Sequence, residues 1–461
     1  MGFFDPTIIR EYDIRGTVGQ TLRENDALLL GKAFGTKILR AQGTSVVVGY
    51  DGRSHSPMLE AALIEGLLST GVRIERVGLC PTPMLYFAVE RQNADAGIMI
   101  TGSHNPPDQN GFKMLLSKRL PGGGPVYGAA IKDLAATVAA KDFVSGQGCV
   151  SDIALLGLYT DRLCNDAAGI KPMNVVWDCG NGVGGVVVPE LVKKLPGKHT
   201  VLFADVDGAF PNHHPDPTEP ENLAALKKAV AQTGADLGIA FDGDADRIGA
   251  VDAQGRVVAG DQLLALYAYD VLKNHPGATI IADVKASQVL FDTVAALGGT
   301  PLMAKTGHSL IKAKMAETGA PLAGEMSGHM FFADTYYGFD DALYAAVRLL
   351  RFLSTSGKSL GEWRDSLPQT LNTPELRIEA DETRKFAVID EVKDRLKTIG
   401  ADVNETDGVR VQTADGWWLL RASNTQAVLV ARAESKSEEG LARLKRSLAD
   451  QLRASGVSWT I

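Results

Sequence analysis

The chain has 461 residues, of which 45% are hydrophobic and 22% charged; this predicts a folded multidomain protein and excludes a disordered or fibrous one. Its 55 Asp and Glu against 47 Lys and Arg give a net charge of −8, so we expect neither nucleic acid nor a membrane as a partner. The sequence shows no signal-peptide pattern and no long apolar run, which predicts a cytoplasmic protein.

Short apolar runs rich in Val and Ile recur along the first three quarters of the chain. Each run ends in a small polar cluster and is followed by a helical pattern, which is typical of an α/β chain with buried strands. The runs also come in pairs, which predicts three related α/β domains in series. The first members of the pairs lie at 45–53, 174–182 and 278–287, and the second members at 96–106, 235–247 and 320–329.

The last part of the chain has a different pattern. Residues 375–380, 409–423 and 427–435 alternate apolar and polar side chains, and 437–452 form an amphipathic helical pattern. This predicts an antiparallel sheet with a helix. We therefore expect three related mixed α/β domains plus a C-terminal α+β domain around a central cleft, with bounds at 1–148, 149–255, 256–366 and 367–461.

The second run of the first domain leads into TGSHNPPDQNGFKM, at 101–114. Ser103 stands between a glycine and His104, and the two prolines that follow stiffen the loop. A serine held in this way at the end of a strand is placed like a nucleophile. The alternative is a turn in which Ser103 bonds only to local backbone.

The matching loop of the second domain is FDGDADR, with Asp242, Asp244 and Asp246 at alternate positions. Three carboxylates so close together repel one another unless a cation lies among them. Oxygen ligands with open positions suit Mg²⁺, and Arg247 follows directly as a partner for phosphate. A solvated acidic turn is the competing interpretation.

The third domain supplies GEMSGH at 324–329. Glu325 and Ser327 alternate and suit two neighbouring sugar hydroxyls, and His329 suits proton transfer near neutral pH. Upstream, Lys285 ends an apolar run and His308 stands beside a glycine in KTGHS. Each of these side chains alone is typical of an ordinary polar surface.

The fourth domain has a short polar loop, RASNT, between two apolar runs. A guanidinium with hydroxyl and amide donors in a tight loop suits a dianionic phosphate, although a polar hairpin turn has the same composition. The N-terminal EYDIRG adds Tyr12 and Arg15. The residues of the loop are Arg421, Ser423, Asn424 and Thr425.

Two further segments compete with this interpretation. The turn at 180–185 satisfies G-x-G-x-x-G through Gly180, Gly182 and Gly185, with Asp205 downstream, as in a dinucleotide site. An NAD-dependent oxidoreductase therefore stays open as an alternative, as does a non-catalytic phosphosugar-binding protein. The histidine pair in FPNHHPDP, at 210–217, is interpreted as a structural loop.

Taken in order, eight motifs resemble the α-D-phosphohexomutase family, in particular its mannose and glucose branch. The resemblance runs through essentially the whole chain and implies the four-domain fold derived above. The motifs are EYDIRG, TGSHNPPDQNGFK, DCGNG, FPNHHPDP, FDGDADR, KTGHS, GEMSGH and RASNT.

The resemblance implies phosphomannomutase and phosphoglucomutase activity. Hexose 1-phosphate and hexose 6-phosphate would interconvert through a hexose 1,6-bisphosphate, with Ser103 carried as phosphoserine and Mg²⁺ held by Ser103 and the three aspartates. It also implies that the RASNT loop and Tyr12 hold the distal phosphate, and that Glu325 and Ser327 bind sugar hydroxyls. Lys113 or His329 is the expected general base, and we expect a monomer or weak dimer. The other side chains expected at the site are Arg15, His104, Arg247, Lys285 and His308.

The chain departs from the family's pattern at one point. After Thr425 the family usually has one residue and then proline, whereas here Gln426 is followed by Ala427. Loss of that proline predicts a more mobile phosphate loop.

Overall fold

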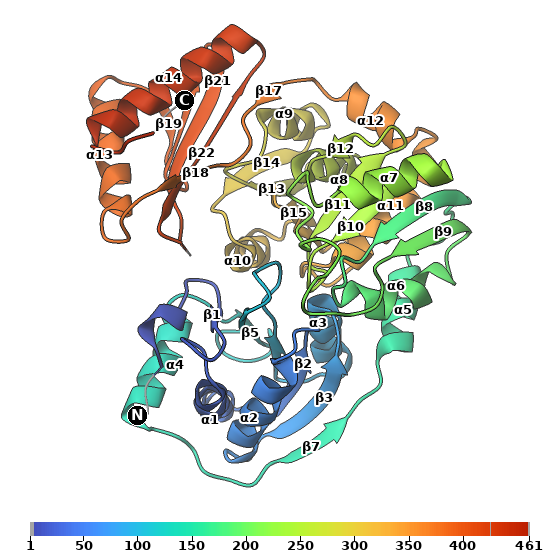
Figure 1. The fold of residues 1–461 in the computed structure, drawn as a ribbon, viewed down its shortest axis with the longest axis vertical. Helices are drawn as coiled ribbons and strands as arrows, with labels where there is room; N and C mark the ends of the chain where they lie inside the picture. Colours follow the sequence, from blue (N-terminus) through green and yellow to red (C-terminus); the bar gives the residue numbers. More distant parts are fainter. Residues whose placement is uncertain (1–3, 425, 460–461) are drawn as a thin grey trace.

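The computed structural model describes residues 4–424 and 426–459, and the strands within these residues form four sheets. Figure 1 shows the sheets following one another around an arc in chain order. The first sheet lies at the bottom in blue and the C-terminal sheet at the upper left in red. No helix of the described residues is long and apolar enough to cross a membrane.

The first domain has a mixed sheet with the strand order β1-β5-β4-β2-β3-β7, and β6 pairs with β5. The pairs β2–β3 and β2–β4 are parallel, whereas β5 runs antiparallel to β4. The strands are β1 (Ile14–Thr17), β2 (Ser45–Tyr50), β3 (Arg73–Leu79), β4 (Ala96–Ile100), β5 (Gln109–Leu116), β6 (Gly124–Pro125) and β7 (Cys149–Asp152). The helices are η1 (Pro6–Ile8), α1 (Glu24–Arg40), α2 (Ser56–Leu68), α3 (Thr82–Arg91) and α4 (Ala129–Ala140).

The second domain repeats this arrangement. Its sheet has the order β12-β11-β10-β8-β9, in which β8 is parallel to β9 and β10, and β11 is antiparallel to β10. The strands are β8 (Met173–Asp178), β9 (Gly197–Leu202), β10 (Leu237–Phe241), β11 (Ile248–Asp252) and β12 (Val257–Val258), and the helices are α5 (Leu156–Cys164), α6 (Gly184–Val192) and α7 (Ala224–Thr233).

The third domain repeats it again with the order β14-β13-β15-β16, with parallel β13–β14 and β13–β15 pairs and an antiparallel β15–β16 pair. The predicted triple repeat is therefore confirmed. Its elements are α8 (Gly260–Asn274), β13 (Thr279–Asp283), α9 (Gln288–Ala296), β14 (Thr300–Ala304), α10 (His308–Thr318), β15 (Leu322–Gly324), β16 (Met330–Phe332), α11 (Ala342–Ser356) and α12 (Leu360–Ser366).

The C-terminal domain has an antiparallel sheet in the order β17-β22-β21-β20-β19, and β18 pairs with β22. This agrees with the alternating pattern of its sequence. Its elements are β17 (Leu371–Asn372), β18 (Leu376–Glu379), α13 (Lys385–Thr398), β19 (Asp402–Asn404), β20 (Val409–Thr413), β21 (Gly416–Ala422), β22 (Val428–Ser435) and α14 (Glu438–Ala454).

The central strands explain where the candidate loops lie. β4, β10 and β15 are buried along their whole length, as expected for strands covered on both faces. Each of them is parallel to a central neighbour and ends in one of the predicted polar loops. The carboxyl ends of such strands form the usual ligand-binding edge of an α/β sheet.

The domain bounds stay a prediction, and one strand bears on the first of them. β7 begins after the expected end of the first domain at residue 148, yet it pairs in parallel with β3. The first sheet therefore continues to Asp152, because this edge strand completes the sheet before the chain leaves for α5.

Candidate active site

The predicted nucleophile loop follows β4. Ser103 is a non-glycine residue with φ of 50° and is only 1% exposed. Its Oγ donates a hydrogen bond to Asp242 Oδ2 at 2.9 Å and lies 3.2 Å from His104 Nδ1. Left-handed backbone at a buried non-glycine residue is strained, and such strain concentrates at functional sites. The hydroxyl therefore reaches the second domain instead of bonding only within its own turn.

The three aspartates follow β10 and are fully buried. Their ligand oxygens lie within 4.8 Å of one another. Asp242 Oδ1 accepts hydrogen bonds from the backbone N–H groups of Asp246 and Arg247 at 3.0 and 3.1 Å. Burial and the charges of Asp246 and Asp244 raise the pKa of Asp242 well above its usual value. These contacts rule out a solvated acidic turn.

The donor set fits a divalent cation. Asp244 Oδ1 is buried and accepts no hydrogen bond within the described residues, whereas Oδ2 accepts bonds from Thr82 Oγ1 at 2.5 Å and Lys113 Nζ at 2.7 Å. A buried carboxylate oxygen without a partner is costly unless a cation satisfies it. Oxygen ligands of this kind are those that Mg²⁺ prefers.

Lys113 lies on β5 and connects the first domain to the aspartates. Its ammonium also donates to Asp246 Oδ2, and its side chain is only 4% exposed. Although burial disfavours its charged form, Asp244 and Asp246 raise the pKa of Lys113 well above its usual value. The predicted base is thus held as a cation in this arrangement.

His329 connects the second domain to the third. Its Nε2 lies 3.2 Å from Asp246 Oδ1 and 3.4 Å from Arg247 Nε, and its Nδ1 lies 3.0 Å from Glu325 Oε2. Ser327 Oγ is 3.2 Å from the same Nδ1. Although burial disfavours the imidazolium, Asp246 and Glu325 raise the pKa of His329 to about 9.

The phosphate-loop candidates contact the first and third domains. Arg421 Nε pairs with Asp407 Oδ2 at 2.8 Å, and Asp407 accepts a bond from the backbone of Thr306 at 3.1 Å. Asn424 Nδ2 donates to the hydroxyl of Tyr12 at 2.6 Å, and that hydroxyl donates to Thr306 O at 2.9 Å. The hydroxyl of Tyr12, a residue of the first domain, therefore bonds to both the third and the fourth domain.

The structure also places the remaining candidates in this region. Arg15 Nη1 donates to Asn105 Oδ1 in the Ser103 loop at 2.8 Å. The imidazole of His308 stacks on that of His329 with centroids 5.5 Å apart. Lys285 pairs with Glu375 at 3.0 Å. Ser423 N donates to Val428 O at 3.0 Å, and Thr425 lies outside the described residues.

The loop mobility expected from Ala427 in place of proline is opposed by contacts of Gln426, the residue before it. The carbonyl of Gln426 accepts a hydrogen bond from the buried ammonium of Lys385 at 3.0 Å, and its side chain accepts one from Arg377 at 2.5 Å. These contacts tie the end of the loop to α13 and β18. The expected mobility is therefore opposed by two cationic side chains.

The dinucleotide-like turn packs against the protein itself. A Cβ on Gly182 would lie 2.7 Å from Gly243 O, and one on Gly185 would lie 2.0 Å from Ala204 O. The glycines are thus required for close backbone packing, and the oxidoreductase alternative is not supported. In the neighbouring loop His213 bonds to Asp178 at 3.1 Å, as expected for a structural contact.

Sequence reasoning missed several side chains that hold the site together. Asp51 and Arg53 form a buried pair under the Ser103 loop, Thr82 bonds to Asp244, and Asp407 bonds to Arg421. The local sign of them is the polar D-G-R turn at 51–53 after β2, which matches the position of the turns after β8 and β13 in the second and third sheets.

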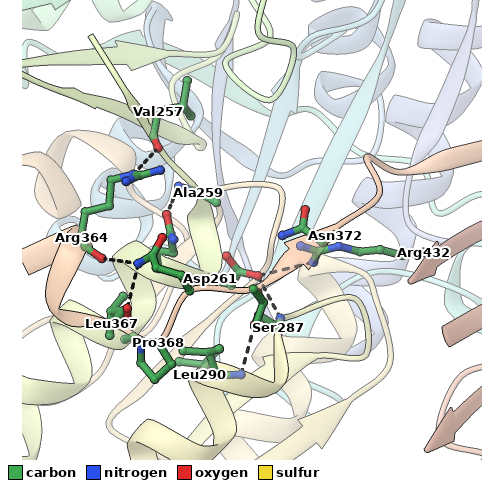
Figure 2. Close-up of a pocket in the computed structure, with 15 residues that line it drawn as sticks. Val257, Ala259, Asp261, Ser287, Leu290, Arg364, Leu367, Pro368, Asn372 and Arg432 are labelled. Carbon is green, nitrogen blue, oxygen red and sulfur yellow. Dashed lines mark hydrogen bonds and ion pairs between the residues drawn. The ribbon is translucent and has the colours of Figure 1, made fainter. Parts of the chain in front are cut away.

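A separate hollow of about 250 Å³ lies where the third and fourth domains meet (Figure 2). None of the predicted site residues that the structure describes lines it. Arg432 Nη1 reaches Asp261 Oδ2 there at 3.4 Å. The hollow therefore belongs to the domain junction and not to the candidate site.

Comparison with known proteins agrees with this arrangement. Family models of phosphoglucomutase/phosphomannomutase match α/β/α domain I at 6–144, domain II at 158–255, domain III at 259–371 and the C-terminal domain at 375–451. This confirms the expected fold class.

Full-length relatives agree as well. The phosphomannomutase/phosphoglucomutase of Pseudomonas aeruginosa is 45% identical over 97% of this chain and 96% of its own length. A phosphoglucomutase of Neisseria gonorrhoeae is 44% identical over 95% of each chain. A crystal structure of a family protein from Burkholderia thailandensis superposes with a TM-score of 0.91 at 42% identity, covering 98% of both chains. The chain belongs to the phosphoglucomutase/phosphomannomutase family.

Proposed function

We propose that this chain interconverts hexose 1-phosphate and hexose 6-phosphate, of mannose, glucose or both, through a hexose 1,6-bisphosphate. Ser103 carries the phosphoryl group between substrates. The observation that carries this proposal is the 2.9 Å hydrogen bond from the Oγ of buried Ser103 to Asp242, one of three clustered carboxylates. The bond puts a nucleophile at a cation-binding cluster, and membership of the mutase family supports the reaction.

The reaction has two matched transfers. The bond from phosphorus to Ser103 Oγ breaks as phosphorus bonds to the free hydroxyl oxygen of a hexose monophosphate; that hydroxyl loses its proton and Oγ gains one. The bisphosphate then turns around, and its other phosphoryl group returns to Ser103 Oγ as the isomeric monophosphate leaves. Such transfers depend chiefly on positioning and charge neutralisation.

Asp242, Asp244 and Asp246, with an oxygen of the phosphoserine, would hold Mg²⁺. When bound, the ion neutralises charge on the transferred phosphoryl group. Arg247 adds a fixed positive charge beside the cluster, through its position after Asp246 and its contact with His329. The proton of the attacking sugar hydroxyl passes to Lys113 or His329, both of which contact Asp246. Both side chains are held as cations in this arrangement, so the one that acts as the base must first give up its own proton.

The other loops bind and orient the sugar. Glu325 and Ser327, joined through His329, bind sugar hydroxyls in either orientation of the intermediate. Arg15, His104, Lys285 and His308 line the same region. The distal phosphate, whichever carbon it is on, is held by Arg421, Ser423, Asn424, Thr425 and Tyr12. One chain supplies every loop, so we expect a monomer or weak dimer in the cytoplasm.

A coupled assay tests the proposal with mannose 1-phosphate and glucose 1-phosphate, Mg²⁺ and a trace of glucose 1,6-bisphosphate. Both the absence of a 6-phosphate product and a wild-type turnover of Ser103→Ala contradict it. We expect Ser103→Ala to lower kcat by at least about 10³-fold, because removal of a nucleophile has effects of this order. Ser117→Ala is the matched control, a buried serine of the same domain.

Intact mass spectrometry separates a mutase from a non-catalytic phosphosugar-binding protein. Incubation with glucose 1,6-bisphosphate adds one phosphate to the wild-type chain and none to Ser103→Ala if Ser103 is the carrier. A binding protein gains no covalent phosphate.

A further inference from the structure

Arg53 is a fully buried arginine below the Ser103 loop, and the reaction described above does not use it. It follows β2 in the turn at 51–53, and its side chain is 1% exposed. Its Nε pairs with Asp51 Oδ2 at 3.1 Å. Asp51 also accepts hydrogen bonds from Ser56 Oγ at 2.6 Å and from the backbone of Gly102 at 3.0 Å. The buried charge is therefore paired and anchored.

The other four N–H groups of the guanidinium all bond to the loop that carries Ser103. Nη2 donates to the carbonyls of Ser103 at 2.9 Å and Asn105 at 2.7 Å. Nη1 donates to the carbonyls of Pro106 at 2.5 Å and Gln109 at 3.0 Å. A guanidinium has five N–H donors in a fixed plane, and here each of them has a partner.

The loop also fits the guanidinium in shape. A Cβ on Gly102 would lie 2.4 Å from Arg53 Cζ, so only glycine lets the backbone lie this close to the planar group. The next residue, Ser103, holds its φ of 50°. Such a conformation persists only when its surroundings fix it, and the bond from Arg53 to Ser103 O acts on that residue directly.

Arg53 further connects this loop to the second domain. Its guanidinium lies 5.2 Å from the ring centroid of Phe210. A Cβ on Gly208 would lie 2.5 Å from Arg53 Cα, so the segment around 208–210 packs closely on the turn. The aspartates that Ser103 Oγ faces are in the same domain as this segment.

We propose that Arg53 is a positioning residue for phosphoryl transfer: it fixes the backbone of the Ser103 loop and thereby the place of Ser103 Oγ relative to Asp242. The inference rests on the proposed mutase function. Lysine cannot replace arginine here, because its three tetrahedral donors cannot meet one carboxylate and four carbonyls.

The test compares Arg53→Lys with the wild-type full chain in the Mg²⁺-supplied mutase assay. We expect kcat to fall about 100-fold, since a displacement of about 1 Å at a reacting group has this effect. We expect the KM for hexose 1-phosphate to change less than about threefold, because no bond of Arg53 reaches the phosphate loop. Guanidinium ion should restore part of the kcat of Arg53→Ala.

Arg348→Lys is the matched control. Arg348 is equally buried and pairs with Asp270 and Asp334, and its other hydrogen bonds go to Thr335 and Tyr344, away from the Ser103 loop. We expect Arg348→Lys to lower the stability of the chain without lowering kcat. A kcat of Arg53→Lys within threefold of wild type, or an equal fall of kcat in Arg348→Lys, overturns the inference.

Hydrogen exchange of a peptide covering 101–111 gives a readout that does not need activity. Faster exchange there in Arg53→Lys but not in Arg348→Lys supports the inference, and unchanged exchange overturns it. A wild-type chain that shows no mutase activity contradicts the proposed function, while the exchange result still decides whether Arg53 fixes the loop. If Arg53→Ala does not fold, Arg53→Lys carries the test.

Discussion

The junctions among the first three domains differ in kind from the junction between the third and the fourth. One apolar cluster runs through the first three domains and includes Leu85, Trp177 and Tyr344. At the other junction the buried apolar cluster of the described residues is small: it consists of Val284, Trp417 and Leu419, with the partly buried Met303 packed against it. The first three domains should therefore behave as one body, because a shared apolar core is lost as a whole.

Polar contacts dominate the junction with the fourth domain. Arg410 donates to the carbonyls of Val284 and Ala286 at 2.8 Å and lies 3.7 Å from the ring centroid of Trp417. Arg432 reaches Asp261 beside the hollow of Figure 2. Buried ionic contacts add little net stability, because desolvation offsets their attraction. The fourth domain is therefore held in a defined place by weaker net forces.

The largest effect is expected from a substitution that removes an aromatic ring from the apolar junction. Phe87 on α3 contacts Tyr159 of the second domain and Tyr337 of the third, with ring centroids 5.5 and 6.1 Å apart. We expect Phe87→Ala to lower the free energy of unfolding by about 3–5 kcal/mol. Urea titration followed by circular dichroism and hydrogen exchange should show protection falling in all three domains together.

Phe386→Ala is the control for Phe87→Ala, since Phe386 is 51% exposed on α13. It should change stability by less than about 0.5 kcal/mol. Protection lost only in the first domain of Phe87→Ala would contradict a shared core.

A smaller effect is expected at the polar junction. Arg410→Met leaves two buried carbonyls of the third domain without donors, which costs about 1–3 kcal/mol. We expect faster exchange within 375–459 and no change within 45–116. Arg443→Met, at a 54% exposed arginine of α14, is the control. Equal changes in both regions would mean that the two junctions are equivalent.

The sequence predicted the fold and most candidate loops because both leave local signals. The runs before Ser103, Asp242 and Glu325 are buried strands, and the polar residues after them lie at strand ends. The roles of Arg53 and Thr82 depend on partners 50 and 162 residues away. A lone arginine or threonine in a turn carries no local sign of such contacts. The glycines at 180–185 indicated a dinucleotide site that the structure does not support. Close backbone packing requires glycine at such positions, just as phosphate binding does.

The smallest expected effect is a pH dependence that separates the two junctions. Asp341, at the start of α11, accepts hydrogen bonds from Tyr159 at 2.8 Å and Tyr336 at 2.7 Å across the second and third domains. Burial raises its pKa to about 6. Glu375, at the junction with the fourth domain, has its pKa lowered to about 2, chiefly by Lys285.

Of these two carboxyl groups only Asp341 titrates between pH 7 and 5, although burial also raises the pKa of Asp283 to about 6. Its folded pKa lies above the unfolded value of 3.8, so the folded state binds the extra proton, and stability rises as pH falls through 6. At pH 5, one unit below that pKa, the extra proton increases the free energy of unfolding by about 1 kcal/mol relative to pH 7. In urea titrations at pH 7 and 5 we expect the gain to be smaller by this amount in Asp341→Asn, which keeps the size but cannot titrate, than in the wild type; the part that stays belongs to groups such as Asp283. Glu375→Gln should leave the gain unchanged, because Glu375 stays ionised throughout this window. A gain that is as large in Asp341→Asn as in the wild type but smaller in Glu375→Gln would place the pH dependence at the polar junction instead.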